Sequence, residues 1–586
     1  MHHNHPTILH VIRERAAHTP YAPAIIHEPS EGSASELTYL DLWKRTSAVA
    51  AQIRGMGKQG DRVVLLFSSG PEFVVAFLGC ILARRIAVPA AVPRNERALE
   101  RTVSIVRDGG ARLIVTTGSM LLKLQAAVRE ARFADGTTPT VVAINAAGWE
   151  AAEDRIDCTP DDIAFLQYTS GSTAHPKGVR VSHGNLSNNL RHIYREFGFN
   201  RPSCLVNWLP AYHDMGLIGG ILAPLYGGCS TVLMSPSEFI QRPVKWLELI
   251  TKYSATISGG PNFAYDACVA RISDRHLEDL NLKSWRVAFN GAEPIRAETV
   301  DRFAAKFTRC GYDANAIFPC YGLAESTILV TCKGETHQYA RVMLDREALK
   351  EGRAVESPES RSGRSLSGCG GPNPDHDVAI VNPDTKQRCS ETEVGEVWVS
   401  GPSVCRGYWN RDEETLATFS AELEGVPDKR FLRTGDLGLF RGGQLYITGR
   451  LKNIVIIRGL NYACEDIEDL AQASHQAVTA TPGAAFGVEN PKGEDLIVTQ
   501  EIDRGYIDNV DRAEVAAAIQ ESIVLHYGIR ASEVVLLQSG TLPRTTSGKV
   551  RRQKARDLYV AGKLSVVSER ETSGVPGDPS RAQGQG

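Results

Sequence analysis

One stretch constrains this chain more than any other: residues 168–178 read Tyr-Thr-Ser-Gly-Ser-Thr-Ala-His-Pro-Lys-Gly. An apolar run at 163–166 precedes it and predicts a short buried strand. Gly171 and Gly178 permit backbone conformations that a side chain forbids, so successive N–H groups can form a concave nest for an anion. Hydroxyl groups and one positive charge lie in the same loop, on Thr169, Ser170, Ser172, Thr173 and Lys177. The loop is therefore predicted to hold a polyphosphate.

Two other interpretations of this loop must be weighed. A Walker A loop has the order Gly-x-x-x-x-Gly-Lys-Ser/Thr, in which the lysine follows the second glycine. Here Lys177 precedes Gly178, and Val179 stands where a hydroxyl would hold Mg²⁺, so the order excludes that loop. A solvated surface turn rich in Ser and Gly is the second alternative. The preceding strand and the lysine favour phosphate binding.

The bulk properties narrow the class of protein. A chain of 586 residues is expected to form about two to four domains. The net charge of −3 indicates no nucleic-acid partner. The 12 cysteines include no Cys-x-x-Cys pair, which argues against a zinc site or a disulfide framework and for a reducing compartment. The N-terminus lacks the pattern of a signal peptide, and the most apolar stretch, 73–83, is too short to span a bilayer. We expect a cytoplasmic protein without a transmembrane segment.

The order of strand-like and helix-like segments predicts the fold class. Alternating segments over residues 8–160 imply an α/β domain with parallel sheet covered by helices on both faces. A β-rich part from 394 to 409 lies near the end of a large domain, residues 1–450. Residues 451–570 carry their own strands and helices, which is enough for a small mobile α+β domain. The tail, 571–586, is rich in Gly, Ser, Pro and Gln and is expected to be disordered.

Several residues after the loop suit nucleotide chemistry. Tyr321 can stack its ring on adenine, and Glu325 can offer the hard oxygen that Mg²⁺ prefers. The alternative for Glu325 is an acid at a helix start, favoured by the helix dipole. Asp436 follows a predicted strand at a glycine turn and could accept both ribose hydroxyls; a simple turn aspartate is the alternative. Arg450 can reach ribose or phosphate.

In this order, the motifs resemble those of the adenylate-forming superfamily, which comprises acyl-CoA synthetases, luciferases and adenylation domains of peptide synthetases. The resemblance covers about residues 8–560. Residues 208–217, Trp-Leu-Pro-Ala-Tyr-His-Asp-Met-Gly-Leu, resemble a signature of one branch, the fatty acyl-AMP ligases. An added segment at 333–367 and the run Gly-Cys-Gly-Gly-Pro-Asn-Pro-Asp-His at 368–376 resemble the same branch. A disordered surface loop is the alternative for 333–367.

The resemblance implies an activity and its participants. A medium- to long-chain fatty acid attacks ATP, pyrophosphate leaves, and an acyl-adenylate forms. The acyl group then passes to the phosphopantetheine thiol of an acyl carrier protein, or of a carrier domain in a polyketide or peptide synthase. The implied catalytic residues are Lys549, His213, Glu325 and Lys177, and Mg²⁺ is implied on Thr169 and Glu325. The implied nucleotide-binding residues are Thr169, Ser170, Gly171, Ser172, Thr173, Gly291, Ala292, Glu293, Tyr321, Gly322, Asp436 and Arg450.

Two further hypotheses concern the substrates. Gly259, Gly260 and Ala264 are small, which suggests an open channel for an unbranched acyl chain. The end of the small domain is basic and could attract an acidic carrier protein, although an ordinary solvated basic loop is the alternative. The basic residues concerned are Arg544, Lys549, Arg551, Arg552, Lys554 and Arg556.

Two alternative functions stay open. One is a fatty acyl-CoA ligase, which the added segment at 333–367 disfavours. The other is a non-catalytic binder of acyl-AMP or nucleotide, which the presence of Glu325, Asp436 and Lys549 disfavours. Residues 458–464, Arg-Gly-Leu-Asn-Tyr-Ala-Cys, depart from the His- or Pro-containing stretch usual in fatty acyl-AMP ligases. That departure concerns the transfer step more than adenylation.

Overall fold

A computed structural model places the chain in two compact units, Met1–Lys452 and Asn453–Gly586. The residues that it describes are 7–93, 95–130, 138–144, 155–169, 176–334, 338–357, 363–457, 460–479, 482–490, 493–507, 509–545 and 548–567. The predicted tail, 571–586, lies outside them. Among the described residues, every helix is too short or too polar to serve as a membrane span. The large unit is called the N-unit below, and the small one the C-unit.

The phosphate-loop strands belong to a six-stranded sheet of the N-unit, in the order β6-β5-β3-β4-β7-β8. Every neighbouring pair is parallel except β7 and β8, which are antiparallel. The strand bounds are β3 Arg62–Leu66, β4 Ile86–Ala90, β5 Leu113–Thr116, β6 Thr140–Ala143, β7 Ile163–Thr169 and β8 Lys177–Ser182. Residues 86–90 form β4, because all five residues are buried and pair in register with β3.

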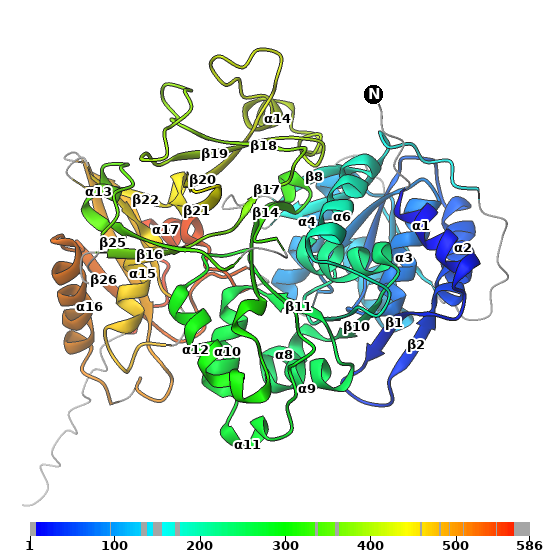
Figure 1. The fold of residues 1–586 in the computed structure, drawn as a ribbon, viewed down its shortest axis with the longest axis horizontal. Coiled ribbons are helices and arrows are strands. Elements are labelled where there is room, and N and C mark those ends of the chain that lie inside the picture. The colour runs from blue at the N-terminus through cyan, green and yellow to red at the C-terminus, as the bar shows by residue number, and fades with distance from the viewer. Residues whose placement is uncertain are drawn as a thin grey trace, which may run out of the picture. The chain divides into compact units, whose positions relative to one another are not determined.

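A nine-stranded sheet forms the other half of the N-unit, in the order β17-β14-β13-β12-β11-β9-β10-β1-β2 (Figure 1). The strand bounds are β1 Pro23–Glu28, β2 Ser35–Thr38, β9 Cys204–Asn207, β10 Ser230–Met234, β11 Ile257–Gly260, β12 Val287–Asn290, β13 Ile317–Gly322, β14 Leu329–Cys332 and β17 Gly371–Pro372. Its centre is parallel, and β2, β14 and β17 at the edges are antiparallel. The predicted α/β class is confirmed, with mixed rather than purely parallel sheets.

Helices fill the connections between these strands, as the alternating pattern predicts. Those of the N-unit are α1 Ile8–His18, α2 Tyr39–Arg54, α3 Pro71–Leu82, α4 Glu96–Gly109, α5 Gly118–Glu130, α6 His183–Glu196, α7 Ala223–Gly227, α8 Pro236–Gln241, α9 Val244–Lys252, α10 Asn262–Arg271, α11 Asp274–Leu277, α12 Ala297–Phe307, α13 Arg346–Lys350 and α14 Asp412–Phe419. The other helical segments are the π-helix η1 Met215–Leu222 and the short 3₁₀ turns η2 Thr308–Cys310, η3 Ala314–Ala316, η4 Ala324–Ser326 and η5 Leu451–Asn453.

Local chemistry sets the start of α6 directly after β8. Ser182 accepts a hydrogen bond from the backbone N–H of Asn185, and the Asn185 side chain accepts one from the N–H of Ser182, which forms a capping box. This cap begins the helix directly after Ser182. Because β8 leads into α6 without a loop, the strand after the phosphate loop is tied to a rigid element.

The added segment at 333–367 is folded wherever the structure describes it. β15 Arg341–Asp345 pairs antiparallel with β16 Gly363–Ser367. Leu344 and Leu366 pack with Leu439 and Tyr446. Those two residues belong to the antiparallel sheet β18 Asp377–Val381, β19 Gly395–Ser400, β20 Leu432–Arg441 and β21 Gln444–Arg450. The alternative of a disordered surface loop is therefore wrong for this part of the segment.

The C-unit is a small α+β domain with its own core. Its elements are β22 Ile454–Ile457, β23 Leu460–Ala463, α15 Cys464–Ala473, β24 Ala484–Asn490, β25 Gly493–Glu501, α16 Arg512–Tyr527, β26 Glu533–Leu537 and α17 Arg552–Val560. β24, β25 and β26 form one sheet, and β22 with β23 forms a second. α15 and α16 pack together over buried residues such as Ile467, Ile519 and Ile523.

A buried ion pair joins α15 to α17 in the C-unit. Both oxygens of Glu468, which is 3% exposed, accept from Arg552, at 2.5 Å from Nε and 2.6 Å from Nη2. Arg544 is also engaged, since it donates to the Pro482 carbonyl at 2.7 Å. The hypothesis of an exposed basic face is therefore wrong for Arg552 and Arg544, because both guanidinium groups are used inside the unit.

Breaking this pair is expected to destabilise the C-unit. Replacing Glu468 by leucine leaves a buried guanidinium partly unpaired, which typically costs roughly 3–5 kcal/mol. Hydrogen exchange of the β24 and β25 amides in the intact protein measures that loss. The double variant E468L/R552M removes both charges and is expected to recover most of the protection. Equal exchange in the single variant and the wild type would contradict the role of the pair.

Candidate functional site

The base of the predicted phosphate loop is the end of β7 and the start of β8. Thr169, the last residue of β7, is directly opposite Lys177, the first residue of β8. Tyr168 is opposite Gly178, and a Cβ on that glycine would lie 3.0 Å from the Tyr168 ring. The two ends of the loop therefore stand side by side. The loop residues Ser170, Gly171, Ser172 and Thr173 lie outside the described residues.

Lys177 is held by two residues from a distant part of the sequence. Its ammonium group forms an ion pair with Glu414 at the start of α14. It also lies 5.2 Å from the centre of the Tyr408 ring, within the range of a cation–π contact. Lys177 lowers the pKa of Glu414 below its ordinary value. The lysine is thus pre-positioned at the loop, although its charge is already paired.

The residues around Glu414 connect α14 to the other side of the loop. Arg411 lies between two carboxylates, 3.5 Å from Glu414 and 2.9 Å from Asp108 at the end of α4. Asp108 also accepts a hydrogen bond of 2.7 Å from the Tyr168 hydroxyl. This chain of contacts ties both strands of the loop to α4 and α14. Sequence reasoning did not identify Glu414, Arg411 or Asp108, since no local pattern marks them.

Glu325 lies in the turn η4, which follows β13, the strand that carries Tyr321. Its Oε1 accepts a hydrogen bond of 2.8 Å from the Tyr408 hydroxyl, and its carbonyl accepts one of 2.9 Å from the Cys405 N–H. The chain reverses so tightly here that a Cβ on Gly322 would lie 1.6 Å from the Ile328 carbonyl oxygen. Only glycine fits at that position, so Gly322 shapes the turn that carries Glu325.

The groups that shift the pKa of Glu325 show which segments surround it. Burial raises the pKa of its carboxyl above the ordinary value, and the Tyr408 hydrogen bond and the positive charge of Arg450 oppose that rise. The nearby Asp214 carboxylate adds to the rise. Asp214 begins η1 by accepting from the Met215 N–H at 2.7 Å, and His213 directly precedes it. The structure therefore brings together four segments distant in sequence.

Asp436 does not lie at a turn, as the sequence suggested, but inside β20, opposite Arg450 on β21. Its Oδ1 accepts from Arg450 Nε at 2.6 Å, and its Oδ2 accepts from the Tyr321 hydroxyl at 2.8 Å. The turn was predicted from Gly435, whose φ of +71° is instead accommodated within the strand. Each carboxylate oxygen can accept a second hydrogen bond, so the two contacts leave capacity for hydroxyl groups of a ligand.

Three neighbouring residues directly follow the strand β12. Gly291 is buried, and a Cβ there would lie 2.8 Å from the Cys320 carbonyl oxygen. Ala292 is exposed and has a φ of +68°, which is uncommon for a residue with a side chain. Glu293 accepts from the Phe263 N–H at 2.6 Å and so caps the start of α10. Their role under adenine stays a prediction.

The small residues on β11 do not border open space. A Cβ on Gly259 would lie 2.0 Å from the Phe289 carbonyl oxygen, and one on Gly260 would lie 2.5 Å from the Trp208 ring. These glycines are needed for close packing, so the inference of an open acyl channel from their size is wrong. Trp208 in turn stacks on Phe239, with ring centres 3.9 Å apart.

Lys549 belongs to the C-unit, and its side chain is exposed. The Thr545 N–H donates to the Lys549 carbonyl at 2.7 Å, and the Lys549 N–H donates to the Thr545 hydroxyl at 3.0 Å. These bonds shape the loop through the backbone of Lys549 and the hydroxyl of Thr545. Its catalytic role stays a prediction.

One cluster in the described part of the chain has the residue types of a metal site: His192, Asp375 and His376. The Ser403 N–H donates to Nε2 of His376 at 3.3 Å, which puts the proton of that ring on Nδ1. Nδ1 faces Asp375 Oδ1 at 3.0 Å, and Arg191 lies 2.7 Å from the other oxygen. A metal would break these bonds beside a positive charge, so the cluster is a hydrogen-bonded link from α6 to residues 375 and 376.

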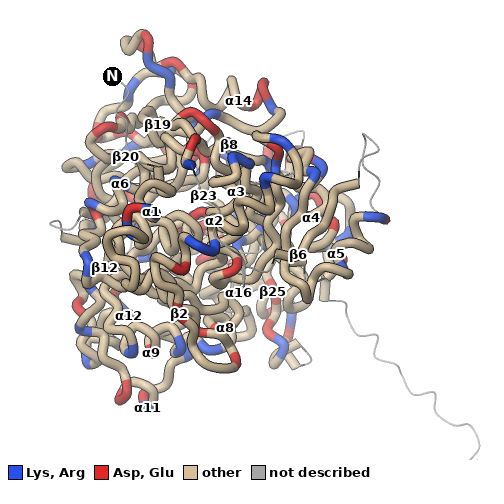
Figure 2. Tube along the Cα trace, turned by 90° about the vertical axis from the view of Figure 1, so that its right-hand side faces the viewer, with Lys and Arg blue, Asp and Glu red and all other residues tan. Residues whose placement is uncertain are grey.

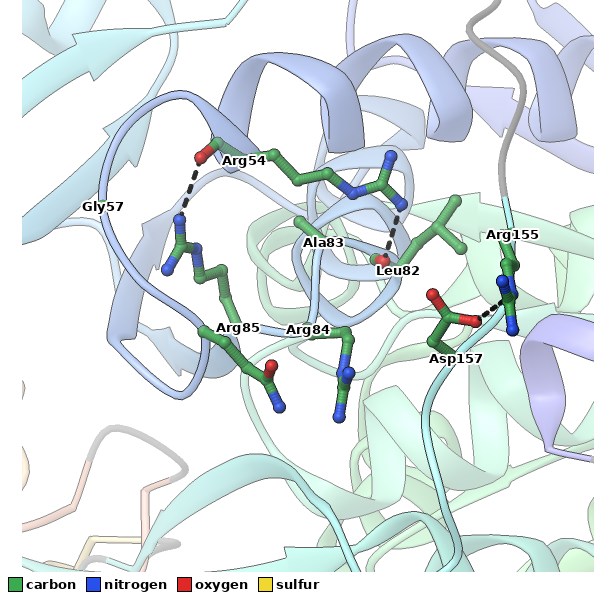
Figure 3. A pocket seen from close by; sticks show the side chains of 9 residues that line it. Arg54, Gly57, Leu82, Ala83, Arg84, Arg85, Arg155 and Asp157 are labelled. Atoms are coloured by element: carbon green, nitrogen blue, oxygen red, sulfur yellow. Dashed lines mark hydrogen bonds and ion pairs between the residues drawn. The ribbon is translucent and has the colours of Figure 1, made fainter.

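A hollow of about 400 Å³ lies elsewhere in the N-unit (Figure 3). Arg54, Arg84, Arg85 and Arg155 line it together with Asp157, and most of these guanidinium groups already bond to protein. Arg54 donates to the Leu82 carbonyl at 3.1 Å, Arg85 to the Arg54 carbonyl at 3.1 Å, and Arg155 pairs with Asp157 at 2.6 Å. The hollow adjoins the start of β4, whereas Thr169 ends the parallel strand β7. It is therefore separate from the phosphate loop.

Charges of both signs are interspersed along the N-unit. In Figure 2, Lys and Arg alternate with Asp and Glu over the side that faces the viewer. Many of them are paired, including Arg302 with Asp266 at 2.6 Å and Lys429 with Asp377 at 2.7 Å. This distribution agrees with the small net charge.

Comparisons with known proteins show what this chain is similar to. The family of AMP-binding enzymes matches residues 12–409. The chain is 38% identical to the medium-chain-fatty-acid–[acyl-carrier-protein] ligase JamA of Moorena producens, over 91% of each chain. It is 34% identical to the corresponding ligase TtuA of Teredinibacter turnerae, over 96% of this chain and 94% of that protein. The crystal structure of a fatty acyl-adenylate ligase from L. pneumophila, in complex with acyl adenylate and pyrophosphate, matches with a TM-score of 0.73, 38% identity, and coverage of 96% and 97%.

Proposed function

The chain belongs to the AMP-binding enzymes and, within them, to the fatty acyl-AMP ligases, and from that premise we propose its reaction. It activates a medium- to long-chain fatty acid with ATP to an acyl-adenylate, and pyrophosphate leaves. It then passes the acyl group to the phosphopantetheine thiol of an acyl carrier protein or carrier domain. The observation that carries this proposal is the convergence of Lys177 and Glu325 on one residue, Tyr408.

Adenylation brings two anions together, so the protein must neutralise charge and align the reactants. Lys177 and the loop N–H groups hold the phosphates of ATP. When ATP binds, the Lys177 ammonium leaves Glu414 and pairs with the phosphates instead. Tyr321 supports adenine, and Asp436 accepts from the ribose hydroxyls. Arg450 lies beside Asp436 and keeps that carboxylate in place. His213 lies between the acyl group and the α-phosphate.

Mg²⁺ fits the donors that this site offers. Glu325 and Thr169 present oxygen ligands, which Mg²⁺ prefers, and a half-buried carboxylate with a raised pKa gains from a cation beside it. When bound, the ion supplies charge neutralisation at the phosphates. The role of the protein is to hold Glu325 in place. It does so through the tight turn at Gly322 and the hydrogen bond from the Tyr408 hydroxyl.

Lys549, in the C-unit, is the proposed catalytic lysine. An exposed ammonium on a loop can contact both the fatty carboxylate and the α-phosphate. Lys452, in η5, ends the N-unit and is the proposed hinge residue for movement of the C-unit. All twelve cysteines are free thiols, which supports a cytoplasmic location.

The added segment at 333–367 is proposed to select the acceptor. It disfavours the arrangement of the units that would accept free CoA, because a packed segment shifts the population of arrangements. The test is to incubate the protein with labelled acetate, a medium-chain or a long-chain fatty acid, ATP and Mg²⁺. Each reaction is run alone, with excess CoA, and with a phosphopantetheinylated carrier protein.

Acyl-AMP is the expected product alone and with CoA, and acyl-carrier the expected product with the carrier protein. The longer acids should be used far better than acetate, since each buried CH₂ contributes about 0.8 kcal/mol. Efficient acyl-CoA synthesis would favour the alternative, a fatty acyl-CoA ligase. Binding of ATP without any product would favour a non-catalytic nucleotide binder.

A further inference from the structure

Residues 406–409 attach to β8, the strand that follows the phosphate loop. The Arg180 N–H donates to the Gly407 carbonyl at 2.9 Å, and the Trp409 N–H donates to the Gly178 carbonyl at 2.8 Å. Tyr408 forms an isolated antiparallel bridge with Val179 between these two bonds. The backbone of Tyr408 is therefore fixed beside the strand that begins with Lys177.

The side chain of Tyr408 contacts two predicted catalytic residues that come from different elements. Its hydroxyl donates to Glu325 Oε1 at 2.8 Å, and the Lys177 ammonium lies 5.2 Å from its ring centre. The ring is 6% exposed and also packs edge-on against Phe419, with ring centres 5.2 Å apart. Two different parts of one rigid side chain thus serve the two catalytic residues.

The hydroxyl of Tyr408 can act only as a donor to Glu325. An ionised carboxylate oxygen carries no proton and can only accept, so the Tyr408 hydroxyl is the donor of this bond. Among the described residues, no other side chain donates a hydrogen bond to the Glu325 carboxylate. The Tyr408 hydroxyl therefore restrains rotation of this carboxylate together with the backbone N–H of Glu325.

We infer that Tyr408 is a positioning residue that sets the Glu325 carboxylate for the metal ion and Lys177 for the phosphates, and so couples the two. The inference rests on the proposed adenylation reaction. Its ring and its hydroxyl have separable tasks: the hydroxyl orients Glu325, and the ring supports Lys177. A purely structural tyrosine would affect stability but would not distinguish metal-bound from metal-free ATP.

The experiment measures ATP binding by calorimetry, without fatty acid, once in MgCl₂ and once in EDTA. Tyr408→Phe removes the hydroxyl and keeps the ring, so binding in MgCl₂ is expected to weaken roughly tenfold, as for loss of one hydrogen bond to a charged group. Binding in EDTA is expected to stay at the wild-type value. Tyr408→Leu also removes the ring and is expected to weaken binding in both buffers.

The matched control is Tyr39→Phe, which removes a buried hydroxyl that donates to the Cys229 carbonyl at 2.9 Å, remote from the loop in sequence and fold. It is expected to leave both affinities unchanged. In the adenylation assay, Tyr408→Phe should raise the KM for Mg·ATP more than it lowers kcat. Unchanged binding in Tyr408→Phe, or equal weakening in both buffers, would overturn the inference. Absence of acyl-AMP formation by the wild type would instead reject the proposed function, which separates the two failures.

Discussion

Replacing Lys549 by alanine is expected to lower acyl-adenylate formation by roughly 10²–10³-fold, as for removal of one preorganised donor from a reacting centre. The fold is expected to survive, because the loop is shaped by the backbone of Lys549 and the Thr545 hydroxyl. Pyrophosphate release with a fatty acid and ATP measures the effect. ATP binding should change far less than the rate, since the lysine acts where the two reactants meet.

Lys563→Ala is the matched control for this variant. Lys563 is also an exposed lysine of the C-unit, just beyond α17, and it carries no predicted role. Its loss is expected to leave the rate near the wild-type value. Pyrophosphate release by Lys549→Ala at that same value would reject the catalytic role of Lys549.

Replacing Glu325 by glutamine is expected to cause a second loss of roughly 10²–10³-fold in adenylation, by the same reasoning about preorganised charge. Glutamine has nearly the same shape and can still accept from the Tyr408 hydroxyl, so the turn should be kept. Only the negative charge that attracts Mg²⁺ is removed. The loss should appear as a higher Mg²⁺ concentration for half-maximal rate, together with a lower maximal rate.

Glu424→Gln serves as control, because Glu424 is an exposed carboxylate of the same unit without a predicted role. An unchanged Mg²⁺ dependence in Glu325→Gln would show that Glu325 holds no metal. In that case the alternative for Glu325, an acid at a helix start, would stand. Thr169 would then lose its predicted partner in binding Mg²⁺.

Much of the fold was accessible from local patterns. The Ser182 cap, the proline start of α3 and the strand before the phosphate loop all follow from short-range chemistry. Buried strands such as β3 show as apolar runs, whatever their neighbours. The run 86–90 contains small residues and a proline, which suit a turn locally. Burial between β3 and β7 makes it a strand instead.

The candidate site divides in the same way. Residues in compact runs, such as Lys177 and the segment from Tyr321 to Glu325, can be identified from spacing and resemblance. Asp436 was identified too, but its place inside β20 depends on its pairing with Arg450 across two strands. The interpretation of Gly259 and Gly260 as signs of an open channel was wrong, because only the fold shows that Phe289 and Trp208 occupy the space beside them.

By itself, the sequence determined the α/β class, the two-part organisation, the family and the order of the motifs, because each depends on residues close together along the chain. Only the tertiary structure decided which side chains meet. Tyr408 contacts both Lys177 and Glu325, and Glu414 pairs with Lys177. Tyr408 and Glu414 each lie more than two hundred residues from Lys177 along the chain. Such contacts leave no periodic or local trace, since they arise from how β8, η4 and α14 pack together.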